Sequence, residues 1–230
     1  MQTKGKFIVV DGPDGAGKET QVRGVVERIR GLGLAVETIR FPQYEEKSAG
    51  AVIRYLREKA YGSAGEVGAK QAALLYAVDR FDGSFKIRRW LADGKIVVSD
   101  RYIPSNMAHQ GGKILDPAER REFFRWLEDV EYGIFNCPRA DLNVILHVPA
   151  EVGQRRANRR DGGSDVHQSD ISHLSAAAAV YLELPSVYSD IVLVRGVEAD
   201  GRELTPDEIH ERVWNLVAPV LDLAKSPAAP

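Results

Sequence analysis

The sequence predicts an α/β fold in which a mostly parallel, five-stranded sheet is flanked by helices. Five short apolar runs alternate with longer stretches whose apolar residues repeat at helical spacing, and this alternation is typical of a parallel sheet. Because the runs are apolar throughout and rich in β-branched residues, we expect strands that are covered on both faces. The expected strands are residues 7–11, 35–39, 96–99, 142–148 and 191–194.

Helices are predicted between and after these strands. Apolar residues repeat every three or four positions over 22–32, and Gly31 and Gly33 mark the end of that helix. Residues 69–91 form one long helix or two short ones. Asp116, followed by a proline at the first helical position, opens a helix through about residue 130. Thr205 and the proline after it repeat this signal before a final helix through about residue 221.

Length and composition favour one globular domain. The 230 residues, 44% hydrophobic and 28% charged, predict a single domain over 1–225, with a mobile, arginine-rich lid at roughly 153–170 and a frayed tail at 226–230.

A net charge of −2 gives no overall basic field for a nucleic-acid or membrane partner. Cys137 is the only cysteine, which excludes an intrachain disulfide and suits a reducing compartment. No apolar run reaches the length of a signal-peptide core or a membrane span, so we expect a cytoplasmic protein.

A glycine-rich loop follows the first predicted strand and opens the first helix. Residues 12–18 read Gly-Pro-Asp-Gly-Ala-Gly-Lys. Glycines let successive backbone N–H groups face one anion, the helix dipole adds positive potential, and Lys18 supplies a full charge. A glycine-rich turn with a surface lysine is the alternative, but strand, loop, lysine and helix occur in the order of a triphosphate-binding loop. With the parallel sheet, this loop predicts a three-layer sandwich of the P-loop NTPase type.

Two carboxylates beside this loop are candidates to bind Mg²⁺. A P-loop lysine is normally followed by Ser or Thr, whose hydroxyl binds the cation, but this chain has Glu19 there and Thr20 one position later, where it should point elsewhere. Glu19 could ligate the cation, repel the phosphates, or pair with a lid arginine. The strand at 96–99 ends in Asp100, which is the Walker B arrangement, although strands that end in a structural Asp are also common.

Six motifs follow one another along the chain. They are the loop 14–18; Arg40-Phe41-Pro42; residues 74–80 (Leu-Leu-Tyr-Ala-Val-Asp-Arg); Asp100-Arg101-Tyr102 with its continuation over 105–111; residues 148–152 (Val-Pro-Ala-Glu-Val) with an arginine cluster behind them; and residues 181–184 (Tyr-Leu-Glu-Leu). Together they resemble the thymidylate (dTMP) kinase family over residues 6–221. The resemblance implies transfer of the γ-phosphoryl group of ATP to dTMP, in dTTP synthesis, with Mg²⁺ as the cofactor. Such chemistry needs positioning and charge neutralisation more than covalent catalysis.

The resemblance also implies roles for individual residues. Arg101 binds the phosphate of the acceptor, Tyr76 stacks on thymine, and Asp14 approaches the 3′-hydroxyl of the sugar. Without the resemblance, Tyr76 reads as a core aromatic, and Asp79 with Arg80 as a surface ion pair. The implied dTMP-binding residues are Asp14, Arg40, Phe41, Pro42, Tyr76, Arg80, Arg101, Asn106, His109 and Gln110, and the implied ATP-binding residues are Gly12, Gly15, Ala16, Gly17, Lys18, Glu19, Thr20 and Arg156.

The lid arginines are implied to complete the active site. Some family members carry a catalytic arginine in the loop where this chain has Gly15, so here the lid must supply it, and Arg160 best matches that residue. Arg156 matches an arginine that packs against adenine. A solvated basic helix end is the alternative. The implied catalytic residues are Lys18, Arg160, Arg101 and Asp14, and the implied metal ligands are Asp100 and Glu19.

Two departures from the family leave alternatives open. His109 stands where relatives often have a tyrosine that crowds out a ribose 2′-hydroxyl, which weakens the expected discrimination against ribonucleotides. One alternative is a kinase of the same fold for another deoxynucleoside monophosphate or for a deoxynucleoside, against which Arg101 favours a phosphorylated acceptor. The other is a catalytically impaired nucleotide-binding regulator, suggested by Glu19. The expected partners are ATP and dTMP, with no nucleic acid and no membrane. The resemblance also implies a homodimer, to which the apolar helix at 69–81 could contribute.

Overall fold

Five parallel strands form one sheet in the order β2-β3-β1-β4-β5. We describe a computed structural model over residues 5–62, 66–160 and 168–223, without the side chains of 157–160 and 168–171. The strands begin and end within one residue of their predicted positions, and every pairing is parallel, which confirms the predicted fold class. Their bounds are β1 (Phe7–Asp11), β2 (Val36–Arg40), β3 (Ile96–Asp100), β4 (Leu142–His147) and β5 (Ile191–Arg195).

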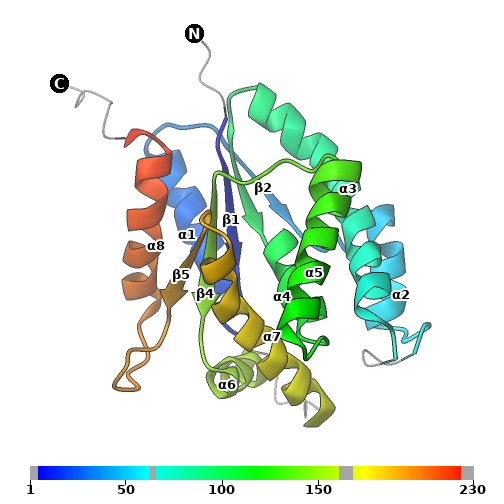
Figure 1. The fold of residues 1–230 in the computed structure, drawn as a ribbon. Coiled ribbons are helices and arrows are strands. Elements are labelled where there is room, and N and C mark those ends of the chain that lie inside the picture. The colour runs from blue at the N-terminus through cyan, green and yellow to red at the C-terminus, as the bar shows by residue number, and fades with distance from the viewer. Residues whose placement is uncertain (1–4, 63–65, 161–167, 224–230) are drawn as a thin grey trace, which may run out of the picture.

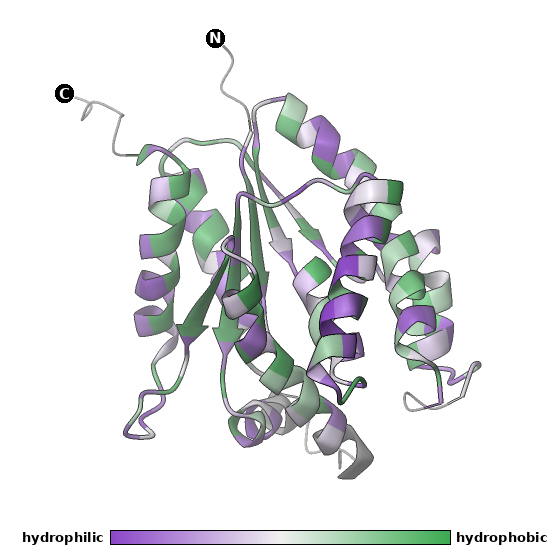
Figure 2. Cartoon of the chain, in the orientation of Figure 1, coloured by the Kyte–Doolittle hydropathy of each residue, from purple (hydrophilic) through white to green (hydrophobic). Residues whose placement is uncertain are grey.

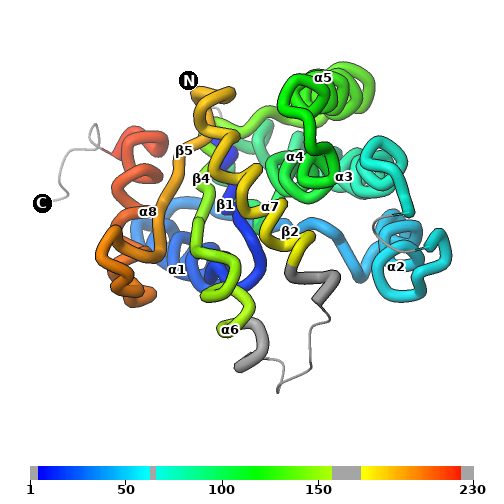
Figure 3. The backbone as a smooth tube through the Cα atoms, turned by 60° about the horizontal axis from the view of Figure 1, so that its bottom comes forward, coloured from blue at the N-terminus to red at the C-terminus, as the bar shows by residue number. Residues whose placement is uncertain are grey.

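Helices cover both faces of the sheet (Figures 1 and 3). The described helices are α1 (Lys18–Gly31), a 3₁₀ turn (Lys47–Ala49), α2 (Gly50–Leu56), α3 (Ala69–Ala92), α4 (Ile103–Gly111), α5 (Pro117–Glu128), a π-helix (Asp129–Ile134), α6 (Ala150–Arg160), α7 (Gln168–Val187) and α8 (Pro206–Val220). α1 and α8 lie together on one face, and α3, α4, α5 and α7 on the other. None of the helices in the described part of the chain is long and apolar enough to cross a membrane.

The predicted helix signals act as expected. Residues 69–91 lie within one continuous helix, α3. Asp116 caps α5, since its carboxylate accepts hydrogen bonds from two backbone N–H groups of the first turn. Thr205 and Glu208 form a capping box at the start of α8. The helix after Asp116 ends earlier than predicted, because its last turn widens into the π-helix.

Two apolar cores, one on each face, hold the layers together. One is built from β-strand residues with α1 and α8, and it includes Ile8, Val144 and Trp214. The other joins the opposite sheet face to α3, α4, α5 and α7, and it includes Phe7 and Tyr102. Figure 2 shows the consequence as hydrophobic strands in the middle and hydrophilic residues on the outer sides of the helices.

The carboxyl ends of the strands bring polar residues from distant segments into one row. Asp100 at the end of β3 pairs in register with Val10 of β1 on one side and with Arg40 of β2 on the other. β1 lies between β3 and β4: the chain runs from β1 to β2 and β3 on one side of it, and then crosses to β4 and β5 on the other side. Such a switch point is where open α/β sheets bind their ligands.

Candidate active site

The loop 12–18 has the backbone conformation that its glycines predict. Gly12 and Gly15 have φ angles of 139° and 75°, which L side chains rarely adopt. A Cβ atom at Gly12 would overlap the carbonyl of Leu146 in β4, and one at Gly15 would overlap the carbonyl of Gly153 in α6. The loop therefore passes directly against the backbone of β4 and of the predicted lid, and position 15 has no room for a side chain.

The loop ends at a helix N-terminus that is open to an anion. Gly17 is the N-cap residue of α1, and within the described part of the chain no side chain caps this end. The buried Nζ of Lys18 donates to the carbonyl of Pro13 at 2.8 Å and lies 3.9 Å from Asp14 Oδ1. Burial and the nearby guanidinium of Arg101 lower the pKa of Lys18 to about 8, although nearby carboxylates oppose the shift.

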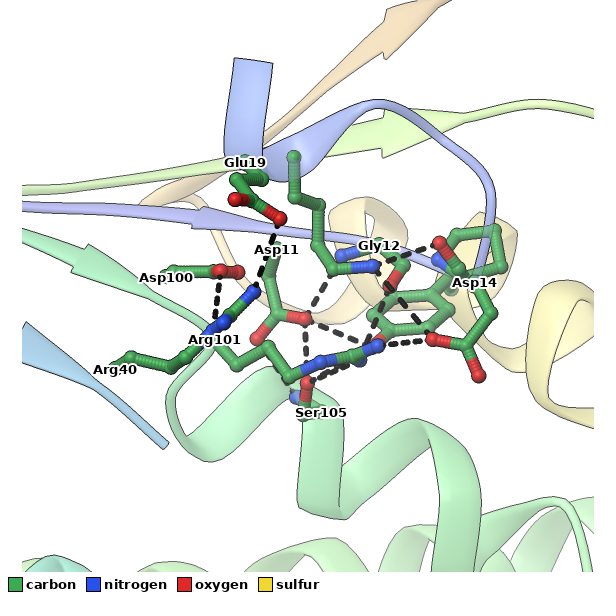
Figure 4. A network of polar contacts seen from close by, with 11 residues as sticks. Asp11, Gly12, Asp14, Glu19, Arg40, Asp100, Arg101 and Ser105 are labelled. Carbon is green, nitrogen blue, oxygen red and sulfur yellow. Dashed lines mark hydrogen bonds and ion pairs between the residues drawn. The ribbon is translucent and has the colours of Figure 1, made fainter. Parts of the chain in front are cut away.

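Asp11 organises the floor of the site, a role that the sequence analysis did not assign. Its buried carboxylate accepts from the backbone N–H groups of Gly12 (2.8 Å), Tyr102 (3.0 Å) and Ser105 (2.9 Å). It also accepts from the hydroxyls of Ser105 (2.5 Å) and Tyr181 (2.8 Å). Asp11 thus ties β1, the turn after β3, α4 and α7 together (Figure 4).

Arg101 projects into the site from a strained backbone position. Its φ of 69° lies in the left-handed region, which is uncommon for a side chain of this size and is found most often at functional sites. The guanidinium pairs with Asp14 and donates to the carbonyl of Gly12 (3.3 Å) and to Ser105 Oγ (3.2 Å). Partial burial opposes the charge of Asp14, but Arg101 and Lys18 outweigh it and hold the pKa of that carboxyl well below its usual range.

Arg40 links the two predicted metal ligands. Its Nε donates to Asp100 Oδ2 at 3.0 Å, and its Nη2 lies 3.4 Å from Glu19 Oε2. Asp100 is buried, whereas Arg40 and Glu19 are exposed. Among the side chains described, Glu19 therefore pairs with Arg40 rather than with a lid arginine.

A cavity of about 890 Å³ opens at this edge of the sheet, a volume suited to small ligands. It brings together most of the predicted ATP-binding residues and half of the predicted dTMP-binding residues. Thr20 lies on it as well as Glu19, so the helix does not turn Thr20 away from the site. The predicted site residues on this cavity are Asp14, Gly15, Ala16, Gly17, Lys18, Glu19, Thr20, Arg40, Phe41, Pro42, Asp100, Arg101 and Arg156; Gly12 does not line it.

The other predicted dTMP-binding residues lie on α3 and α4, off this cavity: Tyr76, Arg80, Asn106, His109 and Gln110. Tyr76 is half-buried and meets Tyr55 edge-on, with ring centroids 6.3 Å apart. Asn106 and Gln110 are buried, and the side-chain oxygen of each has no hydrogen-bond partner among the described residues.

Asp79 and Arg80 do not form the surface ion pair that was considered for them. Both are buried, and they point to different partners. Arg80 pairs with the fully buried Glu131 of the π-helix, its Nε donating at 2.8 Å. Asp79 accepts from the backbone N–H of Gln43 (2.9 Å) and from Ser48 Oγ (2.8 Å). Burial disfavours the charge of Arg80, but Glu131 outweighs it and raises the pKa of the guanidinium.

His109 belongs to an aromatic group that it forms with two residues of α7. It stacks on His173 of α7, with ring centroids 5.6 Å apart, and meets Tyr181 edge-on at 6.1 Å. Burial, followed by the charge of Arg101, lowers the pKa of His109 to about 3. The imidazole is therefore neutral at neutral pH and keeps one nitrogen as an acceptor.

The described part of the predicted lid is helical and is held by one carboxylate. α6 runs from Ala150 to Arg160, so the lid at 153–170 begins inside a helix, and residues 161–167 lie outside the described residues. Arg155 and Arg156 both pair with Glu203, in the segment before α8, and Arg156 donates at 2.8 and 3.2 Å. Arg160 ends α6, and its side chain also lies outside the described residues.

Sequence patterns miss the residues that support this site. Glu131, Glu203 and His173 are reached only through tertiary contacts, and no motif marks them. Asp11 carries a weak signal, because a carboxylate that ends a buried apolar strand beside the loop is the same pattern that singled out Asp100.

A parallel sheet, a triphosphate-type loop with a buried lysine, and the guanidinium of Arg101 as a second cation on the same cavity define a P-loop kinase. The model of the thymidylate kinase family matches residues 10–198, and the chain belongs to that family.

Curated relatives agree with this assignment. The thymidylate kinase of Mycobacterium tuberculosis (strain ATCC 25618 / H37Rv) is 30% identical over 206 residues, which cover 86% of this chain and 94% of that protein. A probable thymidylate kinase of Pyrococcus horikoshii is 33% identical over 216 residues, with coverage of 93% and 96%. The thymidylate kinase of Caulobacter vibrioides is 30% identical over 200 residues, with coverage of 86% and 91%.

Proposed function

We propose that this chain transfers the γ-phosphoryl group of ATP to dTMP, as a single kinase domain over residues 1–225. The observation that carries the proposal is that Lys18 and Arg101, which come from two different segments of the chain, line one cavity and both pair with Asp14. Two cations so placed can hold two phosphate groups close to each other. Phosphoryl transfer requires such positioning and charge neutralisation.

The donor side is formed by the loop and the start of α1. Backbone N–H groups of 15–20 and the dipole of α1 bind the β- and γ-phosphates, and Lys18 neutralises them. Arg156 supports the adenine ring, since its guanidinium lies on the same cavity as the apolar Leu204 and Pro206. Arg160 supplies the catalytic charge from the lid, because the loop has no room for a side chain at Gly15.

Glu19 and Asp100 fit the Mg²⁺ that such a transfer needs. Both are hard oxygen donors on the cavity, and Asp100 Oδ1 is buried with no hydrogen-bond partner among the described residues. No group of three or more metal-ligating side chains lies in the part of the chain described. Mg²⁺ commonly binds through one or two carboxylates, water and substrate phosphates, so two protein ligands suffice. When bound, the cation neutralises the charge of the phosphates.

The acceptor side is formed by the loop 12–18, by residues just after β2 and β3, and by residues on α3 and α4. Arg101 holds the phosphate of dTMP, Asp14 faces the sugar, and the turn at Phe41 and Pro42 borders them. Thymine stacks on Tyr76. The unpartnered side-chain oxygens of Asn106 and Gln110 suit the N–H donor of the base, while Arg80 and His109 complete the pocket.

An ATP-coupled assay across deoxynucleoside and ribonucleoside monophosphates, and across deoxynucleosides, tests this proposal. We expect dTMP to have the highest kcat/KM and thymidine to be inactive, because thymidine has no phosphate for Arg101. A preferred acceptor other than dTMP would reject the assignment of the substrate.

ATP affinity is expected to fall as the pH rises above about 8. Below pH 8 Lys18 is protonated both in the free protein and with phosphate bound, so the affinity for ATP does not change with pH in that range. Above pH 8 the free protein must take up a proton to bind, because a bound phosphate raises the pKa of Lys18. The Kd should then rise by up to about tenfold per pH unit. Calorimetric titration of ATP from pH 7 to 9.5 measures this, and a flat profile in wild type would contradict it.

Replacing Glu203 with alanine is expected to raise the KM for ATP about two- to fivefold, a modest effect because the pairs are exposed. Without this carboxylate, Arg156 loses the bidentate partner that fixes its plane over the cavity. Glu198→Ala is the matched control, since Glu198 lies in the same segment as Glu203 and also pairs with two arginines, Arg202 and Arg212, neither of which belongs to the lid. Steady-state kinetics that give equal KM values for both variants would exclude this role.

We also propose that two copies of the chain associate through α3. Leu74, Val78, Phe81 and Phe85 follow one another at helical spacing and are 39–57% exposed, so they form an apolar stripe on one face of α3. Val78→Glu in this stripe should convert a dimer to a monomer, because it buries an unpaired charge. Leu115→Glu, at an isolated exposed leucine between α4 and α5, should leave the dimer intact. Sedimentation velocity distinguishes the two, and a monomeric wild type would refute the proposal.

A further inference from the structure

Arg40 occupies the space between the two carboxylates that we assign to the cation. It reaches Asp100 from the neighbouring strand, with which it is paired in register, and Glu19 from the first turn of α1. Figure 4 shows the guanidinium between the two acidic side chains, apart from the Arg101–Asp14 pair. Its positive charge thus stands where a metal ion would stand.

Only one of the two carboxylate oxygens of Asp100 has a hydrogen-bond partner among the described residues. The residue is 6% exposed, its Oδ2 accepts from Arg40, and its Oδ1 has no hydrogen-bond partner among the described residues. A buried carboxylate oxygen without a partner is costly, so it calls for a further cationic or donor ligand. The exposed carboxylate of Glu19 lies on the same cavity, and among the described side chains it is held only by a long contact of 3.4 Å to Arg40.

Two other cations on the cavity, Lys18 and Arg101, have other partners. Lys18 donates to the carbonyl of Pro13 and lies near Asp14, and Arg101 pairs with Asp14. Among the described side chains, Arg40 is therefore the cation that pairs with both Glu19 and Asp100, and its single charge leaves the three groups together with one negative charge. Its side chain is 59% exposed, which leaves it free to swing toward the acceptor side of the cavity.

We propose that the guanidinium of Arg40 and the divalent cation compete for the same two carboxylates, Glu19 and Asp100. When the cation takes the two carboxylates, Arg40 leaves them, is repelled by the new positive charge, and becomes available to the phosphate of the acceptor. This inference rests on the proposed function, and it adds that Glu19 couples the metal site to acceptor binding.

The competition has a reciprocal consequence. A cation that frees Arg40 strengthens dTMP binding even without ATP, and dTMP strengthens cation binding by the same factor. We expect about fivefold in each direction, at the low end of such couplings, because Arg40 and Glu19 are both exposed.

A fixed structural role for Arg40 predicts the opposite result. If Arg40 only held Asp100 in place, its removal would loosen Asp100 and weaken cation binding. Under competition, its removal strengthens cation binding. The sign of the change therefore decides between the two.

The first experiment titrates Mn²⁺ into the nucleotide-free protein and follows the free ion by electron paramagnetic resonance. Arg40→Met is expected to bind Mn²⁺ about fivefold more tightly than wild type. Arg54→Met is the matched control, because Arg54 is also 59% exposed and pairs with a carboxylate, Glu58, away from the cavity. Unchanged or weaker binding by Arg40→Met, or no binding by either protein, overturns the proposal.

The second experiment titrates dTMP without ATP, once with EDTA and once with saturating Mn²⁺. Wild type should bind dTMP about fivefold more tightly with Mn²⁺, and Arg40→Met and Glu19→Gln should lose this dependence. Coupling that persists in Arg40→Met comes from direct contact between cation and phosphate and overturns the proposal. Failure of dTMP to bind under either condition instead rejects the proposed function, so the two failures are distinguishable.

Discussion

Lys18→Met is expected to lower kcat/KM for ATP by about a thousandfold or more. Lys18 is the full positive charge at the loop, and the neighbouring Arg101 is held by Asp14 and cannot replace it. Methionine keeps the buried stem of the side chain but carries no charge. Steady-state kinetics with saturating acceptor measure the effect.

The fold should survive this substitution. The depressed pKa of Lys18 means that the folded protein disfavours its charge, so thermal unfolding of Lys18→Met should occur at the same temperature as in wild type or higher. Lys95→Met is the control, since Lys95 pairs with Glu37 at the opposite end of β3. A Lys18→Met protein that kept more than about a tenth of its activity would contradict the proposed role of the loop.

Glu131→Ala is expected to lower the free energy of unfolding by about 3–5 kcal/mol, among the largest effects for a single substitution. It leaves the buried guanidinium of Arg80 without its carboxylate, and it also removes one of the two acceptors of Asn106 Nδ2, which keeps its hydrogen bond to the carbonyl of Ala73. Urea unfolding measures the change. Because Arg80 and Asn106, the two residues that Glu131 holds, are both predicted to bind dTMP, the affinity for dTMP should fall as well.

A double variant separates stability from recognition. Arg80→Met with Glu131→Leu replaces the ion pair by apolar side chains of similar size, so it should recover most of the lost stability. It should not recover dTMP affinity if Arg80 takes part in binding the base. Recovery of both would show that the pair only supports the core, and a stable single variant would contradict the burial of the charges.

The parallel sheet and the loop were predictable because each depends on local signals. Runs of buried β-branched residues mark the strands, and the glycines at 12, 15 and 17 adopt positive φ angles that the loop requires. The capping residues Asp116 and Thr205 likewise act within one helical turn. Such signals lie within a few residues of the structure that they specify.

Side-chain partners were not predictable, because they come from segments far apart in the chain. Arg80 was considered with its neighbour Asp79, yet its partner Glu131 lies 51 residues away. Glu19 was considered with the phosphates or with the lid, yet it meets Arg40 at the end of β2. The first pair depends on the packing of α3 against the π-helix, and the second on the packing of α1 beside β2. The sequence alone does not specify which carboxylate a long arginine side chain reaches.

Turnover of wild type beside Glu19→Thr, with ATP, dTMP and Mg²⁺, tests most directly whether Glu19 belongs to a working kinase site. We predict that wild type turns over at about 1–100 per second, the usual range of kinases. Threonine should change this rate only modestly, because its hydroxyl can also bind the cation. An inert wild type that gains activity in Glu19→Thr would contradict the prediction and indicate a nucleotide-binding protein that has lost catalysis.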